Sequence, residues 1–220
     1  MGKLAASILA ADFANLGAQV ALVEPHVDVF HIDVMDGHFV PPITLGGVVV
    51  KSIRPHTTRT FHGHLMIENP EAQFDDLAEA GLDVVSFHLE AVTDAGPLIR
   101  KARGGGMGVG LTINMETPVE DLFPYLDEID DVMLMSIRPG WSGQELNPAV
   151  FDRVEAVRAE LDRRGLEADV EVDGGITLEN ARRAMDAGAS VLVAASAIFW
   201  ASDPAGAARE LAEIAGEGGP

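Results

Sequence analysis

The stretch His31-Ile32-Asp33-Val34-Met35-Asp36 is typical of a buried β-strand in which polar and apolar side chains alternate. His31 and Asp33 are two residues apart, so their side chains point to the same face of the strand. His64 and Asp173 each end another short apolar run. Two His and two Asp at the ends of three strands meet only if those strands are neighbours in one parallel sheet. Such a set predicts a divalent-metal site and favours an enzyme over a binding module.

Strand-like and helix-like segments alternate along the whole chain, with no break for a second domain. Regular alternation favours a parallel α/β fold, and eight units favour a closed (β/α)8 TIM barrel. We predict a single domain over residues 1–220 with a frayed tail at 216–220. The expected strands are 3–9, 28–34, 57–65, 83–88, 107–113, 131–136, 168–172 and 190–194. The expected helices are 13–23, 47–54, 70–80, 95–103, 119–126, 148–164, 178–187 and 205–215, three of them closed by Gly81, Gly165 and Gly188.

The composition indicates a globular intracellular enzyme. A chain of 220 residues with 47% hydrophobic residues is long enough for one domain with a full core. No apolar run reaches the roughly 20 residues that a membrane span needs, and the N-terminus lacks the features of a secretory signal. Cys is absent, so any metal must be held by His and carboxylate groups. We therefore expect a cytoplasmic protein.

The net charge of -20, from 35 acidic and 15 basic residues, limits the partners of this chain. Such a surface repels nucleic acid and anionic membranes, and we expect neither as a partner. It also repels an anionic substrate at long range, so a phosphate site must be built from local backbone N–H groups. The acidic, Lys-poor composition fits either an ordinary soluble surface or adaptation to high salt.

Polar residues close several of the expected strands, at the end where the active site of an eight-fold barrel lies. Because unpaired polar groups are costly to bury, their convergence on one face predicts a site. His62 shares a strand face with His64, and we expect it to be structural or to support the site, with His88 lining the pocket at most. The strand-end residues are Ser7, Asp33, His64, His88, Asn114, Ser136, Asp173 and Ser196.

Two short segments follow the seventh and eighth strands: Asp173–Thr177, which contains two adjacent glycines, and Ala195–Ala197. In barrels of this class the loops after these strands frequently hold a phosphate on backbone N–H groups. The segment Arg138–Gln144 after the sixth strand is rich in Pro and Gly, which predicts a mobile lid. Three methionines at strand ends are either core residues or an apolar wall around a reactive intermediate. They are Met35, Met66 and Met135.

Four longer motifs, in collinear order, resemble the ribulose-phosphate 3-epimerase family. The resemblance runs from about residue 4 to residue 199. It implies a (β/α)8 barrel that interconverts D-ribulose 5-phosphate and D-xylulose 5-phosphate in the pentose phosphate pathway of carbohydrate metabolism. The motifs are Ser7–Phe13, His31–Pro41, His64–Pro70 and Glu171–Ile176.

The resemblance also implies the residues of the site. One divalent metal ion per subunit, Zn, Fe, Mn or Co, would be bound by His31, Asp33, His64 and Asp173. Asp33 and Asp173 would be the acid–base pair that moves protons through an enediolate. A homo-oligomer, a dimer or a hexamer, is implied as well. The implied substrate-binding residues are Ser7, Met35, His64, Met66, Met135, Gly140, Trp141, Ser142, Gly143, Gly174, Gly175, Ala195 and Ser196.

The chain departs from the family pattern around the lid, the phosphate loops and the rim. Asn is usual where this chain has Arg138, and Phe-Gly is usual where it has Trp141-Ser142. Gly is usual at Ala195 and Asn at Pro42. None of these positions is a predicted metal ligand, so the reaction type is unaffected and the exact substrate is left open. Arg138 either contacts the phosphate or points into solvent.

Three other functions share features with this sequence. A related ketose phosphate such as D-allulose 6-phosphate is the nearest. A lyase of this fold usually carries a Lys at a strand end, whereas Lys3 starts a strand and Lys51 and Lys101 fall on expected helices. A non-catalytic sugar-phosphate-binding barrel would predict the loss of an acid–base residue, yet Asp33 and Asp173 are both present.

Overall fold

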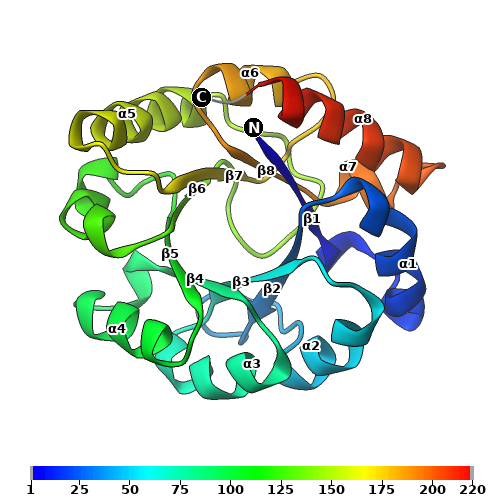
Figure 1. Cartoon of the computed structure of the whole chain (residues 1–220), viewed down its shortest axis with the longest axis horizontal. Helices are drawn as coiled ribbons and strands as arrows, with labels where there is room; N and C mark the ends of the chain where they lie inside the picture. The colour runs from blue at the N-terminus through cyan, green and yellow to red at the C-terminus, as the bar shows by residue number, and fades with distance from the viewer. Residues whose placement is uncertain (1, 219–220) are drawn as a thin grey trace.

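A closed barrel of eight parallel strands forms the centre of the fold in the computed structural model, which describes residues 2–218. The strands follow the chain order from β1 to β8, and β8 pairs with β1 to close the barrel (Figure 1). The TIM barrel expected from the alternation of segments is confirmed. The strands are β1 Lys3–Ser7, β2 Val29–Met35, β3 Thr60–Met66, β4 Val84–His88, β5 Gly108–Ile113, β6 Asp131–Met135, β7 Asp169–Asp173 and β8 Val191–Ala194.

Helices surround the barrel and cover its outer face (Figure 1). The α-helices are α1 Leu16–Val23, α2 Gly47–Ile53, α3 Phe74–Ala80, α4 Gly96–Gly104, α5 Ala149–Arg164, α6 Ala181–Asp186, α7 Ser196–Phe199 and α8 Pro204–Glu217. Short 3₁₀-helices complete the connections: η1 Ile8–Ala10, η2 Phe13–Asn15, η3 Glu24–His26, η4 Arg54–His56, η5 Pro70–Ala72, η6 Leu89–Ala91 and η7 Val119–Glu128. Within residues 2–218, no helix combines the length and the apolar character needed to cross a membrane.

The expected segments match these elements except at their ends and in two places. The segment after β5 is a 3₁₀-helix that contains Pro124, a residue without the N–H that a regular α-helix uses at that position. The four-residue helix α7 was not predicted, because one helical turn leaves no periodic pattern. Helix α8 includes Gly216 and Glu217, so the first part of the expected frayed tail is helical. Residues 219 and 220 of that tail lie outside the described residues.

Alternation along the strands separates an apolar outer face from a polar interior. Phe30, Ile32 and Val34 belong to the large apolar core between β2 and the helices, which leaves His31 and Asp33 on the interior face. Each of the first seven strands contributes at least one buried polar side chain. These side chains are Ser7, His31, Asp33, His62, His64, Ser86, His88, Thr112, Asp131 and Glu171.

Candidate metal centre and substrate pocket

The pairing of β2 with β3 brings the predicted metal ligands together. Asp33 lies directly opposite His64 in the parallel register, and His31 lies opposite His62 one step earlier. Side chains of opposed residues on neighbouring strands point to the same face, here the barrel interior. His31 and His64 are fully buried, and Asp33 is 5% exposed. Two His and one Asp therefore meet through strand register alone.

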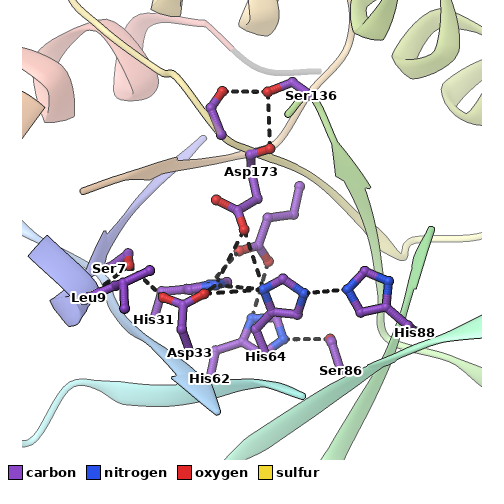
Figure 2. A network of polar contacts seen from close by, with 12 residues as sticks. Ser7, Leu9, His31, Asp33, His62, His64, Ser86, His88, Ser136 and Asp173 are labelled. Carbon is purple, nitrogen blue, oxygen red and sulfur yellow. Dashed lines mark hydrogen bonds and ion pairs between the residues drawn. The ribbon is translucent and has the colours of Figure 1, made fainter. Parts of the chain in front are cut away.

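Asp173 reaches the same place from a strand that is not a neighbour. Strand β7 is separated from β2 by β8 and β1 around the barrel. Asp173 points across the interior toward Asp33 and His64 (Figure 2). The expectation that all three strands are adjacent is therefore wrong, because closure of the barrel brings opposite strands within side-chain reach.

The four predicted ligands form one compact group. Their ligand atoms lie within 4.8 Å of one another. His64 Nδ1 is 3.3 Å from His31 Nε2, 3.4 Å from Asp33 Oδ1 and 3.3 Å from Asp173 Oδ2. A tetrahedral ion with bonds of about 2.0–2.1 Å has ligand–ligand distances of roughly 3.3–3.4 Å. The donor set and its spacing therefore fit a divalent cation.

Electrostatics inside the group also favour a cation. Burial on its own would raise the pKa of Asp33, but the charges and hydrogen bonds of His31 and His64 hold this pKa well below its usual range. Burial would likewise lower the pKa of His31, yet Asp33, Glu171 and Asp173 raise it well above the ordinary value. Three carboxylates thus surround this imidazole. A buried site with this excess of negative charge attracts positive charge.

A pocket opens above the group at the carboxyl ends of the strands. It contains every predicted substrate-binding residue except His64, which with His31 lies beneath the pocket floor. Ser7 Oγ donates to Asp33 Oδ2 over 2.6 Å and so limits the rotation of that carboxylate. The predicted residues that line the pocket are Ser7, Asp33, Met35, Met66, Met135, Gly140, Trp141, Ser142, Gly143, Asp173, Gly174, Gly175, Ala195 and Ser196.

Glycine backbone forms the side of the pocket beyond β7. Gly174 and Gly175 have φ values of 114° and 63°, a region that other residues rarely adopt. A Cβ on Gly175 would lie 2.5 Å from the backbone nitrogen of Leu146, so the neighbouring loop packs directly on this glycine. Ala195, where the family usually has Gly, keeps a negative φ of -113°. This position therefore does not need the left-handed backbone conformation that would favour Gly.

The expected lid is a loop closed by one side chain. Gln144 Nε2 donates to the carbonyl oxygens of Arg138 and Trp141, over 2.8 Å and 2.9 Å. Trp141 lines the pocket and is 46% exposed, and a Cβ on Gly143 would meet the ring of Trp200 at 2.8 Å. Arg138 is exposed and lines a neighbouring cavity instead of this pocket. Of the two expectations for Arg138, this position favours the solvent-exposed one.

His88 lies behind the metal ligands and does not line the pocket, contrary to its predicted place. Its ring lies edge to edge with that of His64, and the two Nε2 atoms are 2.9 Å apart (Figure 2). Burial lowers the pKa of His88 to about 4, so the ring is neutral near pH 7. Its Nδ1 faces Glu90 Oε2 at 3.2 Å, which leaves Nε2 as an acceptor for the N–H of His64. His64 Nδ1 is then the ring nitrogen that faces the other ligands, and a bound metal ion would take the place of its proton.

Glu171 is the polar interior residue that the sequence pattern failed to single out. It is 1% exposed and lies two residues before Asp173 on β7, where an apolar strand was expected. Its carboxylate oxygens face His31 Nδ1 at 3.2 Å and His62 Nδ1 at 3.1 Å. The signal that could have identified it is the two-residue spacing to Asp173, which places both side chains on the interior face.

The family model and the two relatives compared below name the same family of enzymes. The model of the ribulose-phosphate 3 epimerase family matches residues 3–199. The ribulose-phosphate 3-epimerase of Bacillus subtilis is 40% identical over 213 residues, covering 96% of this chain and 98% of the relative. That of Schizosaccharomyces pombe is 41% identical over 206 residues, with 92% and 89% covered. Among solved structures, 3-hexulose-6-phosphate synthase from Salmonella typhimurium has a TM-score of 0.74 at 21% identity, with 98% and 99% covered, a likeness in fold alone.

Proposed function

The chain belongs to the ribulose-phosphate 3-epimerase family, and we propose that it interconverts D-ribulose 5-phosphate and D-xylulose 5-phosphate. The observation that carries this proposal is the meeting of Asp33 and Asp173 in one buried group at the floor of a pocket. The two carboxylates come from β2 and β7, on different sides of the barrel interior. Inverting a carbon centre requires proton-transfer groups on two sides, which this arrangement supplies.

The acid–base roles follow from what each carboxylate can do. One Asp removes the proton at C3, beside the ketose carbonyl, which yields an enediolate. The other returns a proton to the opposite face, and the two exchange roles in the reverse direction. Ser7 supports this chemistry by donating to Asp33 and so holding its carboxylate in one orientation.

The donor set of His31, His64, Asp33 and Asp173 suits a divalent ion such as Zn, Fe, Mn or Co. When bound, the ion supplies a Lewis acid that stabilises negative charge developing on the sugar oxygens. Because His31 and His64 are fully buried beneath the pocket floor, bulk water has little access to this side of the centre.

The phosphate end of the substrate would lie against the loops after β6, β7 and β8. Gly174, Gly175, Ala195 and Ser196 line the same pocket as the two Asp, so their backbone N–H groups are the donors we expect to bind the phosphate. Backbone donors bind phosphate without a cationic side chain, which suits a chain with a net charge of -20. Met35, Met66 and Met135 would form the apolar wall beside the reacting carbons.

A coupled assay of the purified protein with ribulose 5-phosphate and allulose 6-phosphate, side by side, tests the proposal. We expect higher kcat/KM on ribulose 5-phosphate and about one divalent ion per subunit in the same sample. Allulose 6-phosphate is the specific competitor because three departures from the family pattern, Trp141, Ser142 and Ala195, line the pocket. Binding without turnover of either sugar would instead indicate a non-catalytic sugar-phosphate barrel.

The assembly state and the cytoplasmic location stay predictions. The family resemblance implies a homo-oligomer, and a dimer or a hexamer is expected from sedimentation equilibrium. A mass equal to 23.3 kDa across the concentration range would contradict that expectation.

A further inference from the structure

A line of buried polar contacts continues from the metal centre toward the opposite end of the barrel. Glu171 Oε1 lies 3.2 Å from His31 Nδ1, and Glu171 Oε2 lies 3.1 Å from His62 Nδ1. The other ring nitrogen of His62, Nε2, is 2.6 Å from Ser86 Oγ (Figure 2), which is 3.2 Å from Asp131 Oδ2. All five side chains are at most 5% exposed. Neither Glu171 nor His62 lines the substrate pocket, so the acid–base chemistry does not use them.

We propose that Glu171 and His62 are positioning residues that hold the ring of His31 in the tautomer and orientation that metal binding requires. This inference rests on the proposed function, because it takes His31 as a metal ligand. A carboxylate only accepts hydrogen bonds, so the nitrogen of His31 that faces Glu171 carries the proton. The other ring nitrogen, Nε2, faces Asp33 at 3.5 Å and His64 at 3.3 Å, and its lone pair would serve as the metal ligand once a bound ion takes the place of the proton there.

The part of His62 is to hold the carboxylate itself. A Glu side chain has several rotatable bonds, and one contact to His31 would leave its second oxygen free to move. His62 Nδ1 contacts that second oxygen of Glu171 and limits its movement. The contact of His62 Nε2 with Ser86 holds the imidazole of His62 in its orientation. Because His62 lies directly opposite His31 in the β2–β3 register, the carboxylate is held between two parallel-strand neighbours. Partners of this kind typically contribute 10–100-fold to metal affinity.

The test measures metal binding without substrate. Glu171→Ala, Glu171→Gln and His62→Ala are compared with the wild type by chelator competition for Co²⁺ and Zn²⁺ at one fixed pH. We expect Glu171→Ala to raise the metal dissociation constant by about 10–100-fold. Glu171→Gln should have a smaller effect because its amide oxygen still accepts from His31, and His62→Ala should cost only about a few-fold. The visible absorption bands of bound Co²⁺ should shift in Glu171→Ala, since the His31 ring is no longer held.

Asp131→Asn is the matched control for a change to another buried carboxyl of the same interior. Asp131 contacts Ser86 and lies 3.8 Å from His62 Nε2, but within residues 2–218 no hydrogen bond or ion pair joins it to His31. Burial and the nearby charge of Glu171 raise the pKa of Asp131 well above its usual value, so Asn replaces a carboxyl that disfavours its charged form, and we expect Asp131→Asn to keep the metal affinity and the Co²⁺ spectrum of the wild type. A folded Glu171→Ala with wild-type affinity and spectrum would overturn the positioning role. So would an Asp131→Asn that weakens metal binding as strongly as Glu171→Ala.

The same measurements separate this inference from the proposed function. A wild type that binds no divalent ion would overturn the positioning role, whereas a wild type that binds metal but does not epimerise ribulose 5-phosphate would overturn the proposed function. A wild type that binds metal and epimerises ribulose 5-phosphate, together with unaffected Glu171 variants, would overturn the positioning role alone.

Discussion

The two sides of the pocket differ in which part of the chain lines them, side chains on one side and backbone on the other. On the β2–β3 side, side chains on regular strands carry the chemistry, and His31 and His64 are fully buried with a partner at each ring nitrogen. On the side formed by the loops after β6 and β7, backbone dominates, with positive φ at Gly140, Gly143, Gly174 and Gly175. Asp173 ends β7 and belongs to both sides, with 14% of its side chain exposed.

This difference indicates a division of labour. Proton transfer and metal binding need groups held in one orientation, which packed strands and paired imidazoles provide. Binding a phosphate needs several N–H groups at short range, which glycine backbone provides because no Cβ blocks the approach. Substitutions on the strand side should therefore change kcat or metal content, and those on the loop side should change KM.

The largest effect is expected for the two carboxylates. Asp33→Asn and Asp173→Asn should each lower kcat by at least about 10²–10⁴-fold, because each removes one proton-transfer group. Steady-state kinetics together with metal analysis provide the measurement. Near-wild-type turnover at full metal content in either variant would refute the two-carboxylate mechanism.

Solvent isotope incorporation checks the same mechanism in the unmodified protein. If different Asp residues act on the two faces, product formed in D₂O should carry deuterium at C3. Mass spectrometry or NMR of the product locates the label. Product without deuterium at C3 would indicate a chemistry that does not exchange this proton with solvent.

The next largest effect is a difference in metal content between variants of two histidines on one face of β3. His64→Ala should lose bound metal, because His64 Nδ1 lies within 3.4 Å of both Asp carboxylates. His62→Ala should keep its metal content after purification, because His62 contacts Glu171 and Ser86 and belongs to a different group. Elemental analysis of both variants is the measurement, and equal metal loss would contradict the assignment.

On the loop side, Gly175→Ala should raise KM for the phosphorylated sugar by about tenfold or more, the value of one charge-assisted hydrogen bond. The added Cβ would meet backbone atoms of the loop at Gln144 and Leu146, and φ is 63°. Gly165→Ala is the matched control, since its φ of 70° carries the same strain with no atom near the added Cβ. Metal content should be unchanged in both variants. A KM equal to that of the wild type in Gly175→Ala would show that this backbone does not bind phosphate.

The smallest effect concerns Glu90, which supports His88 behind the strand side. Burial would raise the pKa of Glu90, but hydrogen bonds from His88, Thr117 and the backbone N–H of Asn114 lower it from 4.5 to about 2. A carboxyl group whose pKa is lowered by folding stabilises the folded state at pH values above its ordinary pKa. This contribution is lost as the pH falls from about 4.5 to about 2. Because Glu90 is partly exposed, its contribution to the free energy of unfolding is about 1–2 kcal/mol.

Urea unfolding of metal-free wild type and Glu90→Gln measures this contribution. At pH 6 the wild type should have the higher free energy of unfolding, and the gap should close toward pH 3. A gap that is constant with pH would show that the carboxylate charge of Glu90 does not contribute.

Much of the fold and of the metal centre follows from local features of the sequence. Eight apolar runs separated by helix-like segments allow few arrangements other than a closed parallel barrel. The ends of parallel strands share one side of the barrel, so the sequence alone predicts the grouping of His31, Asp33, His64 and Asp173. The Gly residues after the strands could be assigned to loops for the same reason, because their position in the chain fixes their side of the barrel.

The contacts that these residues make across the barrel interior depend on the tertiary structure. Barrel closure sets Asp173 opposite β2 although β7 is not its neighbour, and strand register sets Glu171 between His31 and His62. The contact between the Nε2 atoms of His88 and His64 likewise depends on the pairing of β3 with β4. Periodicity along one strand specifies a face of that strand. Which side chains meet across the interior depends on the register and closure of all eight strands, and no single segment encodes that.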